Sequence, residues 1–192
     1  MGFFGHLVAS RSAPPPSVPD VELEPGSFRL PVWHASDRLG SGWEVYQAWA
    51  VRLAAEVPGG FLSASVLDSD GALLQIGVPG EDVGWTWLHL DGFVSQVLPT
   101  WAPVDEDGEL LPEAEAAAQQ AEWDQYAADY AARLREVSLD DRAAAEMCRR
   151  WASASGLDPA PTQVVGEVLR SHALLVEDTF VRLLSVLGAV RG

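Results

Sequence analysis

The chain has 192 residues, a mass of 20.6 kDa and a hydrophobic fraction of 48%, which is enough to close the core of one substantial domain. Its 28 acidic residues outnumber the 12 basic ones, all of them arginine, and the net charge of −16 excludes ordinary nucleic-acid binding through a basic face. The single cysteine excludes a disulfide framework and a multi-cysteine metal site, and the absence of lysine excludes cofactors that attach through lysine.

The N-terminus carries a short apolar run, residues 3–9, with no basic residue before it and no small-x-small cleavage pattern after it. We therefore predict a cytoplasmic protein, and because charged residues interrupt every longer apolar stretch we expect no contact with a membrane. The opening MGFFGHLVASRS and a composition typical of a GC-rich genome resemble small uncharacterised acidic proteins of actinobacteria. This resemblance implies a high-GC bacterial source and assigns no role to any residue.

Proline dominates the segment that follows. Five prolines precede Phe28, at positions 14, 15, 16, 19 and 25, and Pro31 comes after it. Since proline lacks an amide hydrogen and fixes φ, this stretch cannot be helical. We predict that residues 1–31 form a Pro-rich extended arm and that residues 32–192 form a single domain.

The first half of that domain is predicted to contain one helix and a small antiparallel sheet. A capping box at Ser41 and Glu44, followed by apolar residues at helical spacing, predicts a helix over 42–56. Two alternating segments flank the turn Asp68-Ser69-Asp70-Gly71 and predict a β-hairpin. Residues 84–90 alternate again, which predicts a third strand with Trp85, Trp87 and His89 on one face.

The second half is predicted to be helical. Residues 112–155 contain no glycine and no proline after Pro112, which favours a helix that breaks near Val137 and a second helix that begins behind a Ser138–Asp141 capping pattern. Residues 163–189 carry a broad apolar stripe, predicted as helix with a break near His172. The expected fold class is α+β: a sheet-containing part over 32–104 and a helical part over 112–192 that packs on it.

Charge is distributed unevenly along the chain. The segment from Leu53 to Ala132 contains 15 acidic residues and no arginine, so it holds nearly all of the net charge. One interpretation is an acidic surface with an aromatic centre that steers a basic protein partner. The other is that these acids are solvated turn and helix-start residues. The candidate partner-binding residues are Asp68, Asp70, Glu81, Asp82, Trp85, Trp87, His89, Asp105, Glu106, Asp107 and Glu109.

Motifs for other chemistry are incomplete. Asp68-x-Asp70-Gly71 and Asp105-x-Asp107-Gly108 resemble fragments of a calcium loop but lack its remaining carboxylates, so we predict no metal site. No histidine pair has zinc-ligand spacing, no G-x-S-x-G elbow presents a serine, and we predict no cofactor. The Trp85, Trp87 and His89 face is either covered by helices or forms an exposed aromatic surface for a ligand or partner.

These observations favour a non-catalytic binding protein that engages a basic protein partner through an acidic surface, as immunity or inhibitor proteins do. Direct nucleic-acid binding is not expected. Two alternatives stay open. The first is a small enzyme with a site near His89 and the Asp105 loop, and the second is a structural subunit of a larger assembly that docks through the apolar C-terminal stripe.

Overall fold

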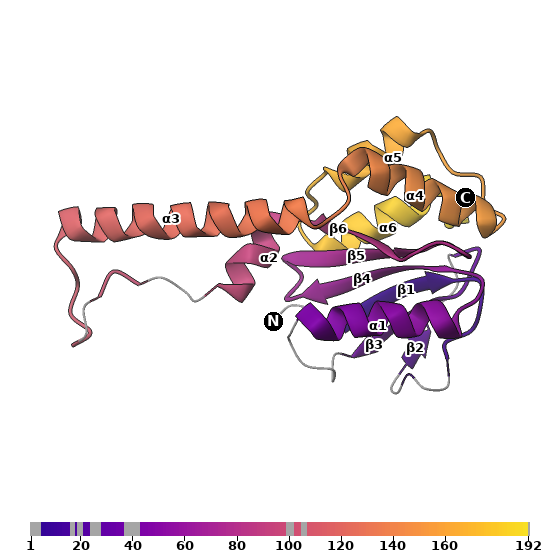
Figure 1. Ribbon diagram of the computed structural model, residues 1–192, viewed down its shortest axis with the longest axis horizontal. Coiled ribbons are helices and arrows are strands. Elements are labelled where there is room, and N and C mark those ends of the chain that lie inside the picture. Colours follow the sequence, from indigo (N-terminus) through magenta and orange to yellow (C-terminus); the bar gives the residue numbers. More distant parts are fainter. Residues whose placement is uncertain are drawn as a thin grey trace.

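The structure, a computed structural model, describes residues 5–15, 18, 21–23, 28–36, 43–98, 102–104 and 107–191 of the chain. These residues form an α+β fold around a six-stranded antiparallel sheet in the order β2-β3-β1-β4-β5-β6 (Figure 1). The strands are β1 (Gly5–Ser10), β2 (Val21–Leu23), β3 (Val32–Ser36), β4 (Phe61–Leu67), β5 (Gly71–Gly77) and β6 (Gly84–Leu88). The helices are α1 (Trp43–Glu56), α2 (Leu90–Val97), α3 (Glu113–Glu136), α4 (Asp141–Ala154), α5 (Thr162–Leu169) and α6 (Val176–Val186). The expected fold class is confirmed.

The N-terminal segment belongs to the sheet. Residues 1–31 were predicted to form an extended arm, but β1 lies between β3 and β4, and Leu7 is paired with both His34 and Ala64. All six residues of β1 are buried, because helices cover both faces of the sheet. A strand that is buried on both faces shows no alternation of apolar and polar residues, so its sequence carries no strand signal. The domain therefore begins before residue 32.

The predicted β-hairpin is confirmed. β4 and β5 pair from Phe61 opposite Gly77 to Leu67 opposite Gly71, and the turn between them places Asp68 and Ser69 at positive φ. The helix predicted over 42–56 is also present as α1, although Ser41 of its predicted capping box lies outside the described residues.

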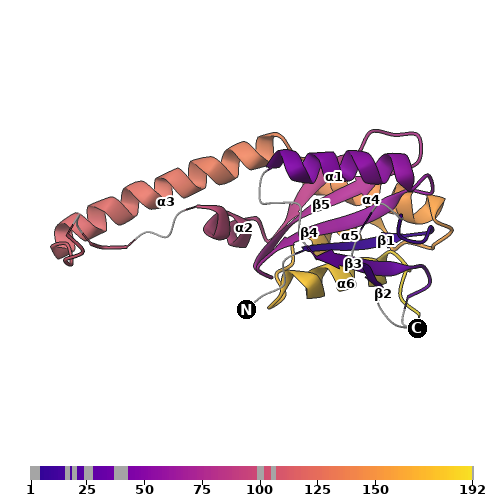
Figure 2. The same cartoon turned by 90° about the horizontal axis from the view of Figure 1, so that it is seen from below.

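The sheet is the middle of three layers. Along β4, Leu62, Ala64 and Val66 point towards α4, α5 and α6, whereas Phe61 points towards α1. Figure 2 shows α1 on the side of the sheet opposite α6. The larger core lies under the C-terminal helices and contains fully buried Trp151 and Phe180. At about 25 cal/mol per Å² of apolar surface removed from water, these faces supply the main stabilisation of the fold.

The C-terminal helices follow the sequence pattern with one correction. α5 and α6 are separated at residues 170–175, where the break near His172 was expected. Cys148 is buried on the inward side of α4, where desolvation raises the pKa of its thiol to about 12. The N-cap of α4 is Asp140, whose Oδ1 accepts a hydrogen bond of 2.7 Å from the amide of Ala143, rather than the predicted Ser138.

Helix α3 projects away from the rest of the molecule in both views (Figures 1 and 2). Its 24 residues span about 36 Å at 1.5 Å per residue, and of these described residues only Ala131 is buried. We call α2, α3 and the described residues between them, within 90–136, the α2–α3 extension. None of the described helices, α3 included, is long and apolar enough to cross a membrane.

Candidate partner-binding surface

Strand β6 holds the C-terminal end of α3. The indole Nε1 of Trp85 donates to the carbonyl of Val137 at 2.8 Å, and that of Trp87 donates to the carbonyl of Leu134 at 3.3 Å. Trp87 is 8% exposed. The two tryptophans therefore do not form an exposed aromatic surface: this face of the sheet is covered by helix, and their role is to anchor α3.

The third strand is shorter than predicted, because the chain turns at His89. That residue has φ 52° and ψ 54°, and α2 begins immediately after it. Left-handed backbone geometry at a non-glycine residue gives no signal in the sequence, so α2 was not predicted. Gly71 and Gly92 allow α2 to lie directly against the β4–β5 turn, since a Cβ atom on either would overlap Phe93 or Asp70.

His89 is a buried side chain that joins α2 to α6. Its Nε2 lies 2.8 Å from Oγ1 of Thr179, and its ring stacks on that of His172 with a centroid separation of 4.6 Å. Burial, assisted by the charge of His172, lowers the pKa of His89 below its ordinary value. A cavity of about 530 Å³ borders both histidines and Arg135. The imidazole of His89 therefore holds the N-terminal end of the α2–α3 extension against α6.

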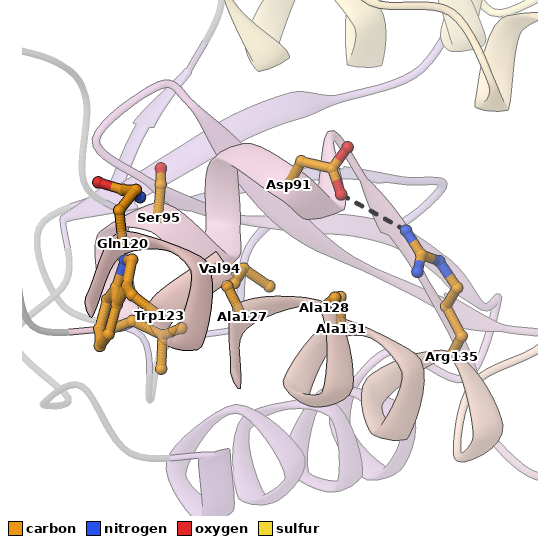
Figure 3. A pocket seen from close by; sticks show the side chains of 10 residues that line it. Asp91, Val94, Ser95, Gln120, Trp123, Ala127, Ala128, Ala131 and Arg135 are labelled. Carbon is orange, nitrogen blue, oxygen red and sulfur yellow. Dashed lines mark hydrogen bonds and ion pairs between the residues drawn. The ribbon is translucent and has the colours of Figure 1, made fainter. Parts of the chain in front are cut away.

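A groove of about 600 Å³ runs between α2 and α3 (Figure 3). Alanines of α3 form its floor, and Val94 of α2 and Leu98, the residue that follows α2, also line it. Trp123 lies at one end, and an ion pair of 3.4 Å between Arg135 and Asp91 closes the other. The groove-lining residues are Asp91, Val94, Ser95, Leu98, Gln120, Trp123, Ala127, Ala128, Ala131 and Arg135.

The α2–α3 extension is strongly acidic on its surface. Its described acidic residues before Arg133 are all exposed: Asp91, Asp107, Glu109, Glu113, Glu115, Glu122, Asp124 and Asp129. The sequence places no arginine between Arg52 and Arg133, and of these acids Asp91 is paired with Arg135 at the end of α3. Apolar side chains are exposed here as well, including Leu110 at 79% and Tyr126 at 49%. An aromatic and apolar centre with a charged rim is typical of protein-binding surfaces.

The predicted partner-binding acids do not all lie together. The turn that carries Asp68 and Asp70 is at the α2 end of β5, whereas the loop that carries Glu81 and Asp82 follows the opposite end of that seven-residue strand. Glu81 is also engaged, because both of its carboxylate oxygens accept hydrogen bonds from Arg150. The acidic surface therefore excludes the Glu81 loop.

Two of the predicted acids, Asp105 and Glu106, lie outside the described residues, while Asp107 and Glu109 are exposed in the connection that precedes α3. Sequence reasoning did not select Glu122, Asp124 and Asp129, which continue the same exposed surface along α3. The signal that could have found them was a long helix-forming segment with acids and no base. Trp123 is half-buried and lines the groove.

Within the described ranges, no three His, Cys, Asp or Glu side chains are grouped so that they could hold a metal ion. Comparisons with protein-family models, with curated proteins and with solved structures found no match to this chain.

Proposed function

We propose that this protein is a non-catalytic binding protein that engages a basic region of a protein partner through the acidic surface of the α2–α3 extension, as immunity and inhibitor proteins do. The observation that carries the proposal is the projection of α3, a helix with exposed acids in a part of the sequence that holds no arginine between Arg52 and Arg133. Carboxylates gathered on a projecting element attract a cationic surface and accelerate its encounter.

The shape of the extension supports the same function. A helix that buried an apolar stripe along its whole length would gain stability from packing, yet only Ala131 of α3 is buried, and the packing of α3 against the core lies in its C-terminal part, around Ala127, Tyr130 and Leu134. Its C-terminal end is fixed by Trp85, Trp87 and the Arg135–Asp91 pair, so the acids are presented on a rigid support. A preorganised surface loses less conformational entropy when a partner binds.

The enzymatic alternative depends on His89, and the contacts of this residue favour a structural role. Its Nε2 is engaged with Thr179 and its ring is stacked on His172, while the surface that carries Asp107 belongs to the connection before α3. The subunit alternative depends on the apolar C-terminal stripe. Most of that stripe packs against the chain's own sheet through residues such as Phe180 and Leu184, which favours a role in the core, although Leu175 is 43% exposed.

The proposal is tested by affinity capture with three forms of the full chain. The first is the wild type. The second carries Glu122→Gln, Asp124→Asn and Asp129→Asn on α3. The third is a control that loses the same number of exposed acids away from the extension, through Asp82→Asn, Glu167→Gln and Asp178→Asn. Retained proteins are eluted with increasing salt and identified, and the affinity of each purified candidate is then measured.

We expect a basic protein that binds the wild type and the control alike, is released by salt, and binds the α3 variant about tenfold or more weakly, because screening and charge removal both act on exposed pairs. A partner that binds the α3 variant as tightly as it binds the wild type would contradict the proposal. So would binding that does not weaken as ionic strength rises.

A further inference from the structure

We propose that the groove between α2 and α3 receives the apolar face of a basic amphipathic helix from the partner protein. This inference rests on the proposed function and adds to it the way in which the partner is held. The acids supply attraction at a distance, and the groove supplies the apolar contact that fixes position and orientation. Such helix-in-groove recognition uses anchors spaced three and four residues apart.

The floor of the groove suits the close approach of another helix. Ala127, Ala128 and Ala131 lie along one side of α3, and their small side chains leave space between the two helices. Val94 of α2 and Leu98, which follows α2, provide further apolar lining. A partner side chain that enters this space removes apolar surface from water on both molecules, which is worth about 25 cal/mol per Å².

The ends of the groove define its polarity. At one end Trp123 offers an aromatic surface, and beside it Gln120 donates to Oδ1 of Asp124 at 2.6 Å. At the other end Asp91 is paired with Arg135 at 3.4 Å, and both side chains of that pair are mostly exposed. At the Trp123 end, cationic side chains of a partner meet the carboxylate of Asp124, and Trp123 can also stack against a guanidinium group.

Charge complementarity identifies the occupant as a basic segment of another protein. A second copy of this chain carries the same net charge of −16 and the same acidic extension, so two extensions repel each other. A neutral apolar helix would fill the groove but gain nothing from the acids around it. A helix with apolar residues on one side and Lys or Arg on the other satisfies both features.

The test uses two synthetic peptides of about 18 residues, or about five helical turns, made from the same numbers of Leu and Lys. In the first peptide the leucines lie on one helical face, and in the second they are scrambled around the helix. Affinities are measured for the wild type, for Ala128→Phe, which fills the groove from an exposed position, and for Ala118→Phe, an exposed α3 position outside the groove.

We expect the wild type and Ala118→Phe to bind the amphipathic peptide about tenfold more tightly than the scrambled one. The reason is that an apolar side chain anchored in a pocket contributes binding free energy that the scrambled peptide lacks. Ala128→Phe should lose this preference and bind both peptides with the affinity of the scrambled one. Unchanged unfolding midpoints of the two variants show that the loss is not due to misfolding.

The outcomes separate this inference from the proposed function. Equal, salt-sensitive binding of both peptides to the wild type overturns the groove proposal and leaves the acidic surface as the whole of the binding site. No binding of either peptide at low salt overturns both. If sedimentation shows that the chain alone dimerises and that Ala128→Phe abolishes the dimer, the groove belongs to a second copy and the proposal is wrong.

Discussion

Two helices of this protein use their residues in opposite ways. α4 has 14 residues and buries six of them against the sheet: Ala144, Ala145, Met147, Cys148, Trp151 and Ala152. α3 has 24 residues, all described, and buries only Ala131. The sequence of α4 is therefore constrained by the core, whereas most of α3 is free of that constraint. The side chains that α3 displays contribute little to folding and are available for binding.

What keeps α3 helical is local rather than tertiary. Its alanines, glutamates and glutamines are strong helix formers, and Gln120 donates to Asp124 and Gln125 to Asp129 one turn along the helix. Glutamates lie in its first turn and arginines in its last, which suits the helix dipole at both ends. We call the sheet together with α1, α4, α5 and α6 the body of the molecule. α3 packs against the core at Ala127, Tyr130, Ala131 and Leu134, and its N-terminal part extends beyond that contact.

The largest expected difference between the two helices comes from their tryptophans. Trp151→Ala should lower the free energy of unfolding by about 3–5 kcal/mol, because Trp151 is fully buried and its removal leaves a cavity under the sheet. Trp123→Ala should cost about 1 kcal/mol or less, since Trp123 is only half-buried at the groove. Urea unfolding of both variants at neutral pH measures the two changes in the free energy of unfolding.

Equal losses of unfolding free energy in Trp151→Ala and Trp123→Ala would contradict this comparison, because they would mean that Trp123 is packed in a core. Binding provides the reverse readout. Trp123→Ala should weaken capture of the amphipathic peptide, while a stably folded variant of the body should leave it unchanged.

The helices and the hairpin could be predicted from the sequence because their signals are local. The alternation around Asp68–Gly71 and the helix-forming composition of 113–136 do not depend on distant contacts. β1 could not be predicted, since both of its faces are buried by helices far away in the sequence, and this removes the periodicity. α2 depends on the left-handed turn at His89, which tertiary contacts impose.

The site could be predicted only in part. The excess of acids in the middle of the chain was visible, and Asp70, Asp107 and Glu109 do lie exposed near or within the extension. Sequence alone could not separate Glu81 from them, because its partner Arg150 comes from a helix 69 residues later. The apolar residues along α3 are divided, since Tyr130 and Leu134 pack against the core around Trp87, whereas Tyr126 is 49% exposed.

A smaller effect is expected at the start of α4. Asp140→Ala removes the side-chain acceptor for the amide of Ala143 and should lower the free energy of unfolding by about 1 kcal/mol. Ser138→Ala is the matched control, since Oγ of Ser138 only donates to the carbonyl of Arg135 at an exposed position. α3 has no such cap, because its N-cap is Pro112. A larger loss for Ser138→Ala than for Asp140→Ala in urea unfolding would show that the cap is misassigned.

The junction between extension and body should respond to pH. Burial lowers the pKa of His89 below 6.5, and the unfolded chain therefore binds that proton more strongly than the folded chain does. The stability that the neutral His89 permits should therefore be complete above the pKa that this residue has in the unfolded chain. It should fall as the pH drops through that pKa towards the lower pKa of the folded chain. His89→Asn tolerates the left-handed backbone and should lose less stability than the wild type between about pH 7.5 and about pH 5.5.

His172→Gln gives a second measurement at the same junction. His172 stacks on His89 and its charge helps to lower the neighbouring pKa, so this variant should show a pH dependence between those of the wild type and His89→Asn. If all three proteins lose stability equally over this range, His89 does not carry the pH dependence.

The smallest effect distinguishes an acid of the body from an acid of the extension. Glu81→Gln breaks the bidentate pair with Arg150 and should lower the free energy of unfolding by about 0.5 kcal/mol or less, because both side chains are more than a third exposed. Glu122→Gln removes a charge that has no ion-pair partner among the described residues and lies on a surface of like charges, so it should leave stability unchanged or raise it slightly. High salt should reduce both differences. A destabilisation by Glu122→Gln equal to that of Glu81→Gln would mean that the acids of α3 serve folding after all, and that the division between a packed body and a binding extension does not hold.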